Sequence, residues 1–175
     1  MEIYLIRHTT PDIDRSICYG QTDLALKNTF EEEAQVVLDQ LPNWFDKIYS
    51  SPLIRCHTLA NAIPANEVIV EPNLRELSFG DWEMRPWKAL PKPEFDHWKQ
   101  NFVHQGPPKG ESMKELQDRV MSWWESVTPD QNTPVGIVAH FAVIRVFMAA
   151  LQNTSLMEVF NQERMEYGAV FRLEV

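Results

Sequence analysis

The Arg7-His8 pair places a permanent cation beside an imidazole at the end of a short apolar segment, residues 2–6. The β-branched and aromatic residues of this segment are typical of a buried strand, and Pro11 cannot continue a strand. An imidazole in this position could attack phosphorus while the guanidinium binds anionic oxygens. An Arg-His pair also fits an ordinary surface turn, so the remaining segments decide between the two interpretations.

Two further residues follow apolar segments in the same way. Arg55 lies a few residues beyond a predicted strand at 48–49, and His140 directly follows a predicted strand at 134–139. Alternating strands and helices build a mostly parallel sheet, and ligands bind at the edge formed by the carboxyl ends of its strands. We therefore expect both side chains to meet the Arg7-His8 pair in one anion-binding pocket. The alternative is charge scattered over the surface.

The pattern of apolar residues predicts a single α/β domain over residues 1–175, a three-layer α/β/α sandwich with a mostly parallel sheet. The strands are expected at residues 2–6, 48–49, 68–70, 134–139 and 168–175. The helices are expected at residues 29–41, 52–63, 93–103, 112–127, 141–151 and 154–160. Turn-forming residues between the first strand and the first helix predict a long loop.

Polar residues and prolines indicate where several helices begin and end. Thr29 is expected to cap the first helix and Pro42 to end it. Ser112, followed three residues later by Glu115, predicts a capping box. Pro52 suits the first turn of a helix, whose amino terminus would then add partial positive charge at the carboxyl edge of the sheet.

The composition narrows the class of protein. The chain has 175 residues and a formal net charge of −9, from 25 acidic and 16 basic residues. This charge argues against nucleic-acid and anionic-membrane partners, although a local arginine cluster can bind a small anion. No apolar segment is long enough to span a membrane, and no secretory leader is visible. Cys18 and Cys56 form no metal-binding pair. We expect a cytoplasmic monomer or homodimer that binds a small phosphorylated molecule.

Residues 84–110 form an insertion rich in proline and aromatic residues. Phe95, Trp98 and Phe102 are spaced as on one face of a helix. Together with Trp87 they predict either a lid or wall for the substrate, or a group of aromatic side chains that only packs the insertion onto the core.

The chain resembles the histidine phosphatase superfamily, also called the phosphoglycerate mutase-like family, over nearly its whole length. The motifs that carry the resemblance are Arg7-His8, the Ser-Ser-Pro-Leu-x-Arg sequence at residues 50–55, the acidic stretch at residues 76–83, and His140. The resemblance implies a phosphoglycerate mutase-like fold, and a phosphohistidine formed on His8 without a metal or other cofactor.

The resemblance and the chemistry of the side chains agree on the roles. His8 must be neutral to attack, and Arg7, Arg55 and His140 favour the neutral imidazole and bind the phosphoryl oxygens. Glu76 is predicted to protonate the leaving oxygen and later to activate water.

Glu83 is the alternative candidate for the acid, its other interpretation being a structural partner of an arginine. We favour Glu76 on the sequence.

Within the superfamily, residues 17–23, 79–87 and 107–112 resemble the α-ribazole phosphatase branch of cobalamin synthesis. This implies hydrolysis of α-ribazole 5'-phosphate. The alternatives are a broad-specificity or sugar phosphatase, a phosphoglycerate mutase-type phosphotransferase, which is typically longer, and a non-catalytic binding module. Besides the two arginines and His140, the residues expected to bind substrate are Gly20, Gln21, Thr22 and Ala142.

The chain departs from the superfamily pattern at three positions. Thr9 and Phe141 stand where a glycine usually follows each histidine, and Asp14 stands where an asparagine is common. The two larger side chains are expected to narrow the pocket, and an ionised Asp14 would repel phosphate unless it points away. These departures bear on the choice of substrate rather than on the core chemistry.

Overall fold

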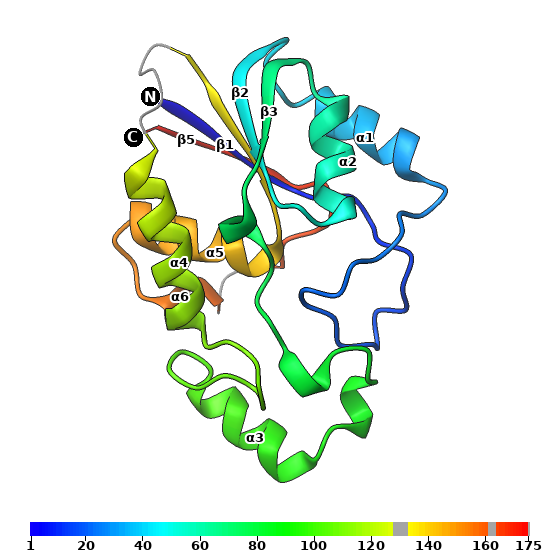
Figure 1. The fold of residues 1–175 in the computed structure, drawn as a ribbon, viewed down its shortest axis with the longest axis vertical. Helices are drawn as coiled ribbons and strands as arrows, with labels where there is room; N and C mark the ends of the chain where they lie inside the picture. Colours follow the sequence, from blue (N-terminus) through cyan, green and yellow to red (C-terminus); the bar gives the residue numbers. More distant parts are fainter. Residues whose placement is uncertain (128–132, 161–163, 175) are drawn as a thin grey trace.

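A computed structural model describes residues 1–127, 133–160 and 164–174. In these ranges, five strands form one sheet in the order β3-β2-β4-β1-β5 (Figure 1). The first four strands in the chain are parallel, and β5 runs antiparallel to β1 at one edge. The strands are β1 Glu2–Arg7, β2 Phe45–Ser50, β3 Ala65–Val70, β4 Val135–Ala139 and β5 Val170–Glu174.

Helices cover both faces of the sheet, with α1 and α2 on one face and α4, α5 and α6 on the other (Figure 1). Their bounds are α1 Phe30–Leu38, α2 Ile54–Ala62, α3 Lys92–Asn101, α4 Met113–Ser126, α5 Phe141–Leu151 and α6 Leu156–Phe160. The predicted three-layer α/β/α sandwich is therefore confirmed. None of the helices in the described ranges has the length and apolar character needed to cross a bilayer.

The central strand β1 is buried on both faces. Ile3 and Leu5 pack in the cluster that includes α4 and α5, whereas Tyr4 and Ile6 pack in the cluster that includes α1 and α2. Successive side chains of a strand point to opposite faces, so a strand covered on both sides must be apolar throughout. This double burial fixes the end of β1, where the chain leaves the sheet.

Beyond the carboxyl ends of the strands, the predicted insertion forms a separate small core around α3 (Figure 1). Trp82 packs edge to face against Trp98, with 5.5 Å between ring centroids. Phe95 and Trp87 lie against the same cluster, as does the buried Cys18 from the N-terminal loop. Most of the predicted aromatic residues therefore pack the insertion.

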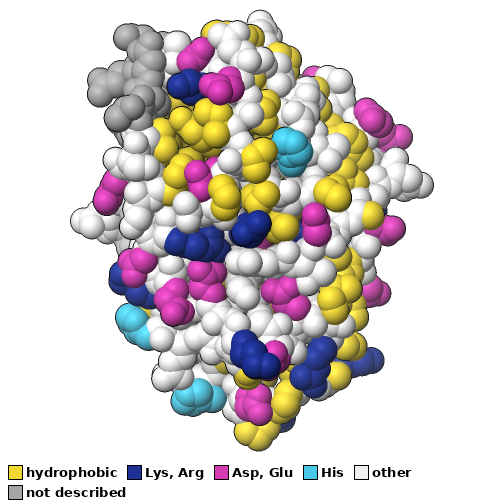
Figure 2. Space-filling model, viewed as in Figure 1, with side chains coloured by type: hydrophobic (Ala, Val, Ile, Leu, Met, Phe, Trp, Pro, Cys, Tyr) yellow, Lys and Arg dark blue, Asp and Glu magenta, His cyan; other side chains and the backbone are white. Residues whose placement is uncertain are grey.

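On the face shown in Figure 2, Lys and Arg side chains alternate with Asp and Glu side chains, and neither sign gathers in one large area. This surface agrees with the absence of a long basic segment in the sequence.

Several element boundaries differ from the sequence prediction. α1 ends at Leu38, before Pro42, because the N–H groups of Gln40 and Leu41 bond three residues back rather than four, which ends the α-helical pattern. α2 begins at Ile54 rather than Pro52, because the N–H of Ser51 still bonds the carbonyl oxygen of Val138 in the sheet.

The strand boundaries also shift. β2 and β3 begin three residues earlier than predicted, at Phe45 and Ala65. β5 begins at Val170, after a turn in which Gly168 has a φ of +71°. Val175, the last residue of the predicted strand, lies outside the described residues.

The predicted capping box at the start of α4 is confirmed. The Ser112 hydroxyl accepts from the N–H of Glu115 at 3.2 Å, and the Glu115 carboxylate accepts from the N–H of Ser112 at 2.8 Å. At the start of α1, by contrast, Thr29 makes no side-chain capping bond, and its hydroxyl donates to the carboxylate of Glu33 instead. The prediction that Thr29 caps this helix through its side chain is wrong.

This difference leads to a stability prediction. Ser112→Ala should lower the free energy of unfolding by about 1 kcal/mol, the usual loss for an N-cap hydroxyl. Thr29→Ala is the matched control, because this residue has the same position in its helix without the capping bond. Urea unfolding curves measure both variants, and equal losses would contradict the assignment of the cap.

Candidate active site

The ends of β1, β2 and β4 lie side by side, because β4 pairs in parallel with both other strands. Arg7 is in register with Ala139, so His8 and His140 leave the sheet next to each other, with ring centroids 5.1 Å apart. Arg55, in the first turn of α2, is close enough for its charge to lower the pKa of both imidazoles. The structure therefore brings together the residues predicted to attack and bind phosphorus.

The hydrogen bonding of His8 fixes its tautomer. His8 is 1% exposed, and its Nδ1 lies 2.7 Å from the carbonyl oxygen of Thr9. A carbonyl oxygen only accepts, so Nδ1 carries the hydrogen and Nε2 of the neutral ring keeps a free lone pair. Burial lowers the pKa of His8 well below its ordinary value of 6.5, and the charges of Arg55 and Arg7 lower it further. The imidazole is therefore neutral near pH 7.

The two guanidinium groups are held by backbone carbonyls. Arg55 donates to the carbonyl oxygens of Gly20 at 2.6 Å and Thr22 at 2.9 Å, and Arg7 donates to that of Met165. Among the residues that the structure describes, Nε of each arginine is buried without a hydrogen-bond partner. Leaving a buried donor unpaired costs free energy, so Nε of Arg7, a residue that lines the cavity with His8, favours an anion there, whereas Arg55 is not among the lining residues.

His140 is fully buried behind His8. Its Nε2 lies 2.8 Å from the hydroxyl of Ser51, and the thiol sulfur of Cys56 is 3.4 Å from the same nitrogen. Burial lowers the pKa of His140 well below 6.5, with further lowering by Arg55 and His8. The second imidazole is therefore neutral as well.

Glu76 is the carboxyl group predicted to act as the proton donor. It lines the same cavity as Arg7 and His8, and it is only 8% exposed. Its Oε1 accepts from the N–H groups of Leu77 at 2.9 Å and Ala142 at 3.2 Å. Burial raises the pKa of Glu76 above its ordinary value in spite of these bonds. A carboxyl group in this state can both give and take a proton.

Glu83 has a different environment. Its carboxylate accepts from the N–H groups of Gln21 at 3.0 Å, Thr22 at 2.8 Å and Phe79 at 3.0 Å. Burial opposes the ionisation of Glu83, but the bonds from Thr22, Gln21 and Phe79 outweigh it and lower the pKa. Glu83 therefore ties the N-terminal loop to the acidic stretch, and no bond to an arginine is involved.

The other residues predicted to bind substrate have internal partners. The carbonyls of Gly20 and Thr22 hold Arg55, and the side-chain amide of Gln21 donates to the carbonyl oxygen of Glu76 at 3.0 Å. The N–H of Ala142 is used by Glu76. None of these four residues is among those that line the cavity.

A cavity of about 310 Å³ opens above His8. Its walls include four aromatic side chains, those of Tyr19, Trp87, Phe141 and Tyr167. The hydroxyls of Tyr19 and Tyr167 lie 2.6 Å apart, and the guanidinium carbon of Arg7 is 4.2 Å from the Tyr167 ring centroid. Trp87 thus serves as a wall residue as well as a packing residue of the insertion.

Charged residues complete the cavity, and sequence reasoning missed them. Arg15 and Arg164 line it together with Glu166, and the last two form an exposed ion pair of 3.1 Å. Residues 164–167 belong to the connection between α6 and β5 and carry no motif. The pairing of β5 with β1 and the bond from Arg7 to the carbonyl oxygen of Met165 bring this connection to the end of β1.

The three departures from the superfamily pattern have distinct environments. Thr9 is fully buried, and within the described ranges its hydroxyl has no hydrogen-bond partner. Phe141 lines the cavity. Asp14 is exposed, accepts from the N–H of Ser16 at 2.7 Å, and is not among the residues lining the cavity. The expected repulsion of phosphate by Asp14 is therefore avoided by its position.

The fold, together with the cluster of Arg7, His8, Arg55 and His140, is typical of one class of protein. The chain belongs to the histidine phosphatase superfamily (branch 1), whose family model matches residues 3–175. The resemblance expected from the sequence is confirmed.

The chain is similar to curated proteins with two kinds of name. It is 30% identical over 167 residues to a Hydrogenobacter thermophilus protein named "Putative phosphoserine phosphatase 2", covering 91% of this chain and 82% of the relative. It is 33% identical over 152 residues to "Probable phosphoglycerate mutase GpmB" of Serratia proteamaculans, covering 80% and 69%.

Solved structures give the same picture of the fold. The α-ribazole phosphatase from Shigella flexneri superposes with a TM-score of 0.86 at 25% identity, covering 100% of this chain and 91% of the other. YhfR of Bacillus stearothermophilus superposes with a TM-score of 0.88 at 25% identity, covering 99% and 91%.

The buried imidazoles predict a loss of stability in acid. Both have a lowered pKa when folded and would bind protons near pH 6.5 when unfolded. Below that pH the unfolded chain binds more protons than the folded chain. Each histidine therefore lowers the free energy of unfolding by up to about 1.4 kcal/mol for each unit that the pH falls, until the pKa of the folded state is reached. Glu76 has a raised pKa and acts in the opposite sense, because its contribution is lost as the pH rises.

Measuring the free energy of unfolding at pH 7 and pH 5 checks this expectation. His8→Asn should lose less stability than the wild type over this interval, whereas His97→Asn, at an exposed position on α3, should lose as much. If His8→Asn lost as much free energy of unfolding between pH 7 and pH 5 as the wild type does, the result would count against a neutral, buried imidazole.

Proposed function

We propose that the chain is a phosphomonoesterase that works through a phosphohistidine on His8. The observation that carries this proposal is the state of His8, a buried neutral imidazole whose Nδ1–H is tied to the carbonyl of Thr9. The unpaired Nε group of Arg7, which lines the cavity, supports an anion beside it. This arrangement supports attack by His8 and binding of the phosphoryl oxygens by the arginines.

The chemistry proceeds in two displacements. In the first, Nε2 of His8 attacks phosphorus in line, the bond from phosphorus to the ester oxygen breaks, and Glu76 gives its proton to the leaving oxygen. In the second, the Glu76 carboxylate takes a proton from water, the resulting hydroxide attacks phosphorus, and the bond to Nε2 breaks. Inorganic phosphate leaves and His8 returns to its neutral state. Arg7 and Arg55 balance the charge of the transferring group in both steps.

We further propose that the reaction needs no divalent metal, because the two arginines already supply positive charge at the phosphoryl group. In residues 1–127, 133–160 and 164–174, no group of three or more His, Cys, Asp or Glu side chains is arranged to hold a metal ion.

α-Ribazole 5'-phosphate is the substrate that the cavity supports best. This molecule has a planar aromatic base on a ribose phosphate, and Tyr19, Trp87 and Phe141 offer aromatic surfaces beyond the phosphate position. The name of the Shigella flexneri structure also supports this substrate. The charged residues Arg15 and Arg164 favour a second candidate, a phosphorylated carboxylic acid such as the phosphoserine or phosphoglycerate that the curated relatives' names contain.

A substrate panel in the presence of EDTA tests the proposal. We expect release of free phosphate from α-ribazole 5'-phosphate with a higher kcat/KM than from phosphoserine or 3-phosphoglycerate, and no activity in His8→Ala. Isomerised phosphoglycerate in place of free phosphate would instead identify a mutase. Activity that disappears in EDTA and returns with one particular metal would refute the metal-free mechanism.

Trp87→Ala supplies the control for substrate choice. If the aromatic base packs on Trp87, this variant should raise KM for α-ribazole 5'-phosphate more than KM for phosphoserine. Equal increases in KM for the two substrates would contradict the argument that the aromatic wall selects the base.

Glu76→Gln tests the assignment of the acid. We expect kcat for an alkyl phosphate to fall by about 10²–10⁴-fold, because the alkoxide needs a proton as it leaves. With p-nitrophenyl phosphate the fall should be much smaller, since nitrophenolate is a stable anion.

Glu83→Gln is the comparison, because its carboxylate holds the backbone of Gln21 and Thr22. It should affect both substrates alike. If the dependence on the leaving group belongs to Glu83→Gln and not to Glu76→Gln, the acid assignment is wrong although the phosphohistidine mechanism stands.

A further inference from the structure

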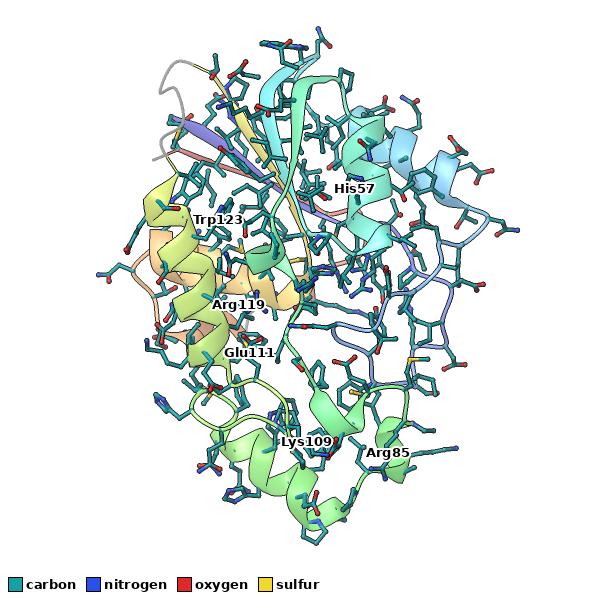
Figure 3. The ribbon with its side chains drawn as sticks, in the orientation of Figure 1. His57, Arg85, Lys109, Glu111, Arg119 and Trp123 are labelled. Atoms are coloured by element: carbon teal, nitrogen blue, oxygen red, sulfur yellow. The ribbon has the colours of Figure 1, made fainter. Side chains whose placement is uncertain are left out.

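Arg119 projects from α4 toward the acidic stretch, with Glu111 beside it (Figure 3). Nε of Arg119 lies 2.7 Å from Oε1 of Glu111, and Nη2 lies 3.0 Å from Oε2 of the same carboxylate. Both side chains are mostly buried, at 21% and 15% exposure. A two-bond pair of this kind fixes the plane of the guanidinium group.

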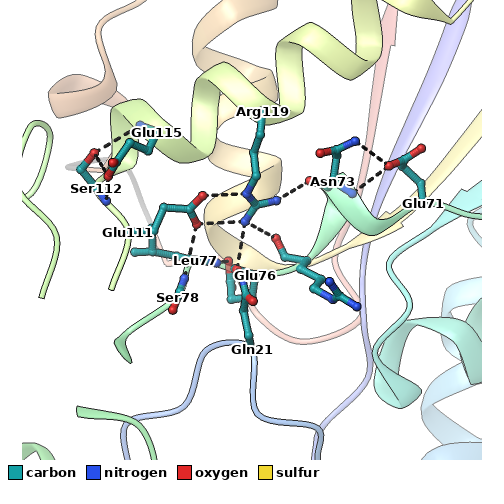
Figure 4. A network of polar contacts seen from close by, with 11 residues as sticks. Gln21, Glu71, Asn73, Glu76, Leu77, Ser78, Glu111, Ser112, Glu115 and Arg119 are labelled. Carbon is teal, nitrogen blue, oxygen red and sulfur yellow. Dashed lines mark hydrogen bonds and ion pairs between the residues drawn. The ribbon is translucent and has the colours of Figure 1, made fainter. Parts of the chain in front are cut away.

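The remaining N–H groups of Arg119 point at the backbone that precedes the acid. Nη1 donates to the carbonyl oxygen of Asn73, and Nη2 lies 2.8 Å from that of Arg75 and 3.1 Å from that of Glu76 (Figure 4). One planar side chain thus contacts three carbonyls within four residues. The η1 turn, Pro72–Leu74, and the strand-like residues after it are held against α4 by these bonds.

Glu76 itself is fixed from several sides. Its carbonyl oxygen also accepts from the side-chain amide of Gln21, and its carboxyl group accepts from the N–H group of Leu77 (Figure 4). The carboxyl group also accepts from the N–H of Ala142. Unlike His8, Glu76 does not leave a strand of the sheet, so the sheet does not determine its position. The bonds from Arg119 and Gln21 supply that constraint at the backbone.

The charge of Arg119 is balanced by Glu111, and Glu111 in turn lies 3.4 Å from the N–H of Ser78. What Arg119 provides to this segment is therefore geometry rather than net charge. A lysine could keep the ion pair, but its single nitrogen cannot reach the carboxylate and three carbonyls in a fixed plane.

We propose that Arg119 is a positioning residue for Glu76, which holds the backbone of residues 73–76 so that the carboxyl group meets the leaving oxygen. This inference rests on the proposed role of Glu76 as the acid. Arg119 is not among the residues that line the cavity, and its hydrogen bonds reach the site through the segment that carries Glu76.

The test compares Arg119→Lys with the wild type on an alkyl phosphate and on p-nitrophenyl phosphate. We expect kcat for the alkyl phosphate to fall by about 10–100-fold, the loss typical of a misplaced catalytic group, with KM little changed. The fall with p-nitrophenyl phosphate should be much smaller. Lys114→Met, which removes an exposed ion pair with Asp118 on the same helix, is the matched control and should leave both rates unchanged.

A double variant separates positioning from general stability. In the Glu76→Gln background, Arg119→Lys should cost little more on the alkyl phosphate, because the group that it positions is already gone. A second loss of full size, or equal losses on both substrates, would overturn the inference and leave Arg119 as a residue of stability alone.

Two further results complete the test. If Arg119→Lys does not fold, Glu111→Gln replaces it, and it should show a weaker loss with the same dependence on the leaving group. If Glu76→Gln shows no dependence on the leaving group, the proposed acid fails and this inference falls with it. If Glu76→Gln shows it and Arg119→Lys does not, only the present inference fails.

Discussion

The burial of Arg55 is the constraint on which the site depends. Its side chain is fully buried, and in the described part of the chain it forms no ion pair with a carboxylate. A buried cation is costly unless polar groups surround it, and here the carbonyls of Gly20 and Thr22 do so. That loop must then be held, and Glu83 holds it by accepting from its N–H groups.

Two kinds of support position the chemical groups. His8 and His140 leave adjacent parallel strands, whose burial on both faces fixes where the strands end. Glu76 comes from a segment outside the sheet and is fixed by hydrogen bonds to its backbone and its carboxyl group. The nucleophile therefore shares the stability of the core, whereas the position of the acid depends on hydrogen bonds outside the sheet, from the backbone and from the side chains of Gln21 and Arg119.

The features that could be predicted from the sequence are those that local residue patterns and the alternation of strands and helices determine. The meeting of His8 with His140 followed from β-α alternation, and α5 has the predicted bounds, 141–151. The start of α2 was misplaced, because a long-range bond between the backbones of residues 51 and 138 extends the pairing of β2 with β4 by one residue, and the helix begins only at Ile54. Tyr167 could not have been found, since long-range contacts, the antiparallel pairing of β5 and the bond to the Tyr19 hydroxyl, bring it to the cavity.

The aromatic insertion shares a small core with Trp82, which lies just before it in the chain, and this core is separate from the two clusters that flank the sheet. It touches the main core through Phe79 and Phe102. One wall of the cavity, Trp87, belongs to this unit. A substitution at Trp87 can therefore change this wall while the packing of the sheet that ends at His8 is kept, so one part of the cavity can vary in evolution separately from the nucleophile.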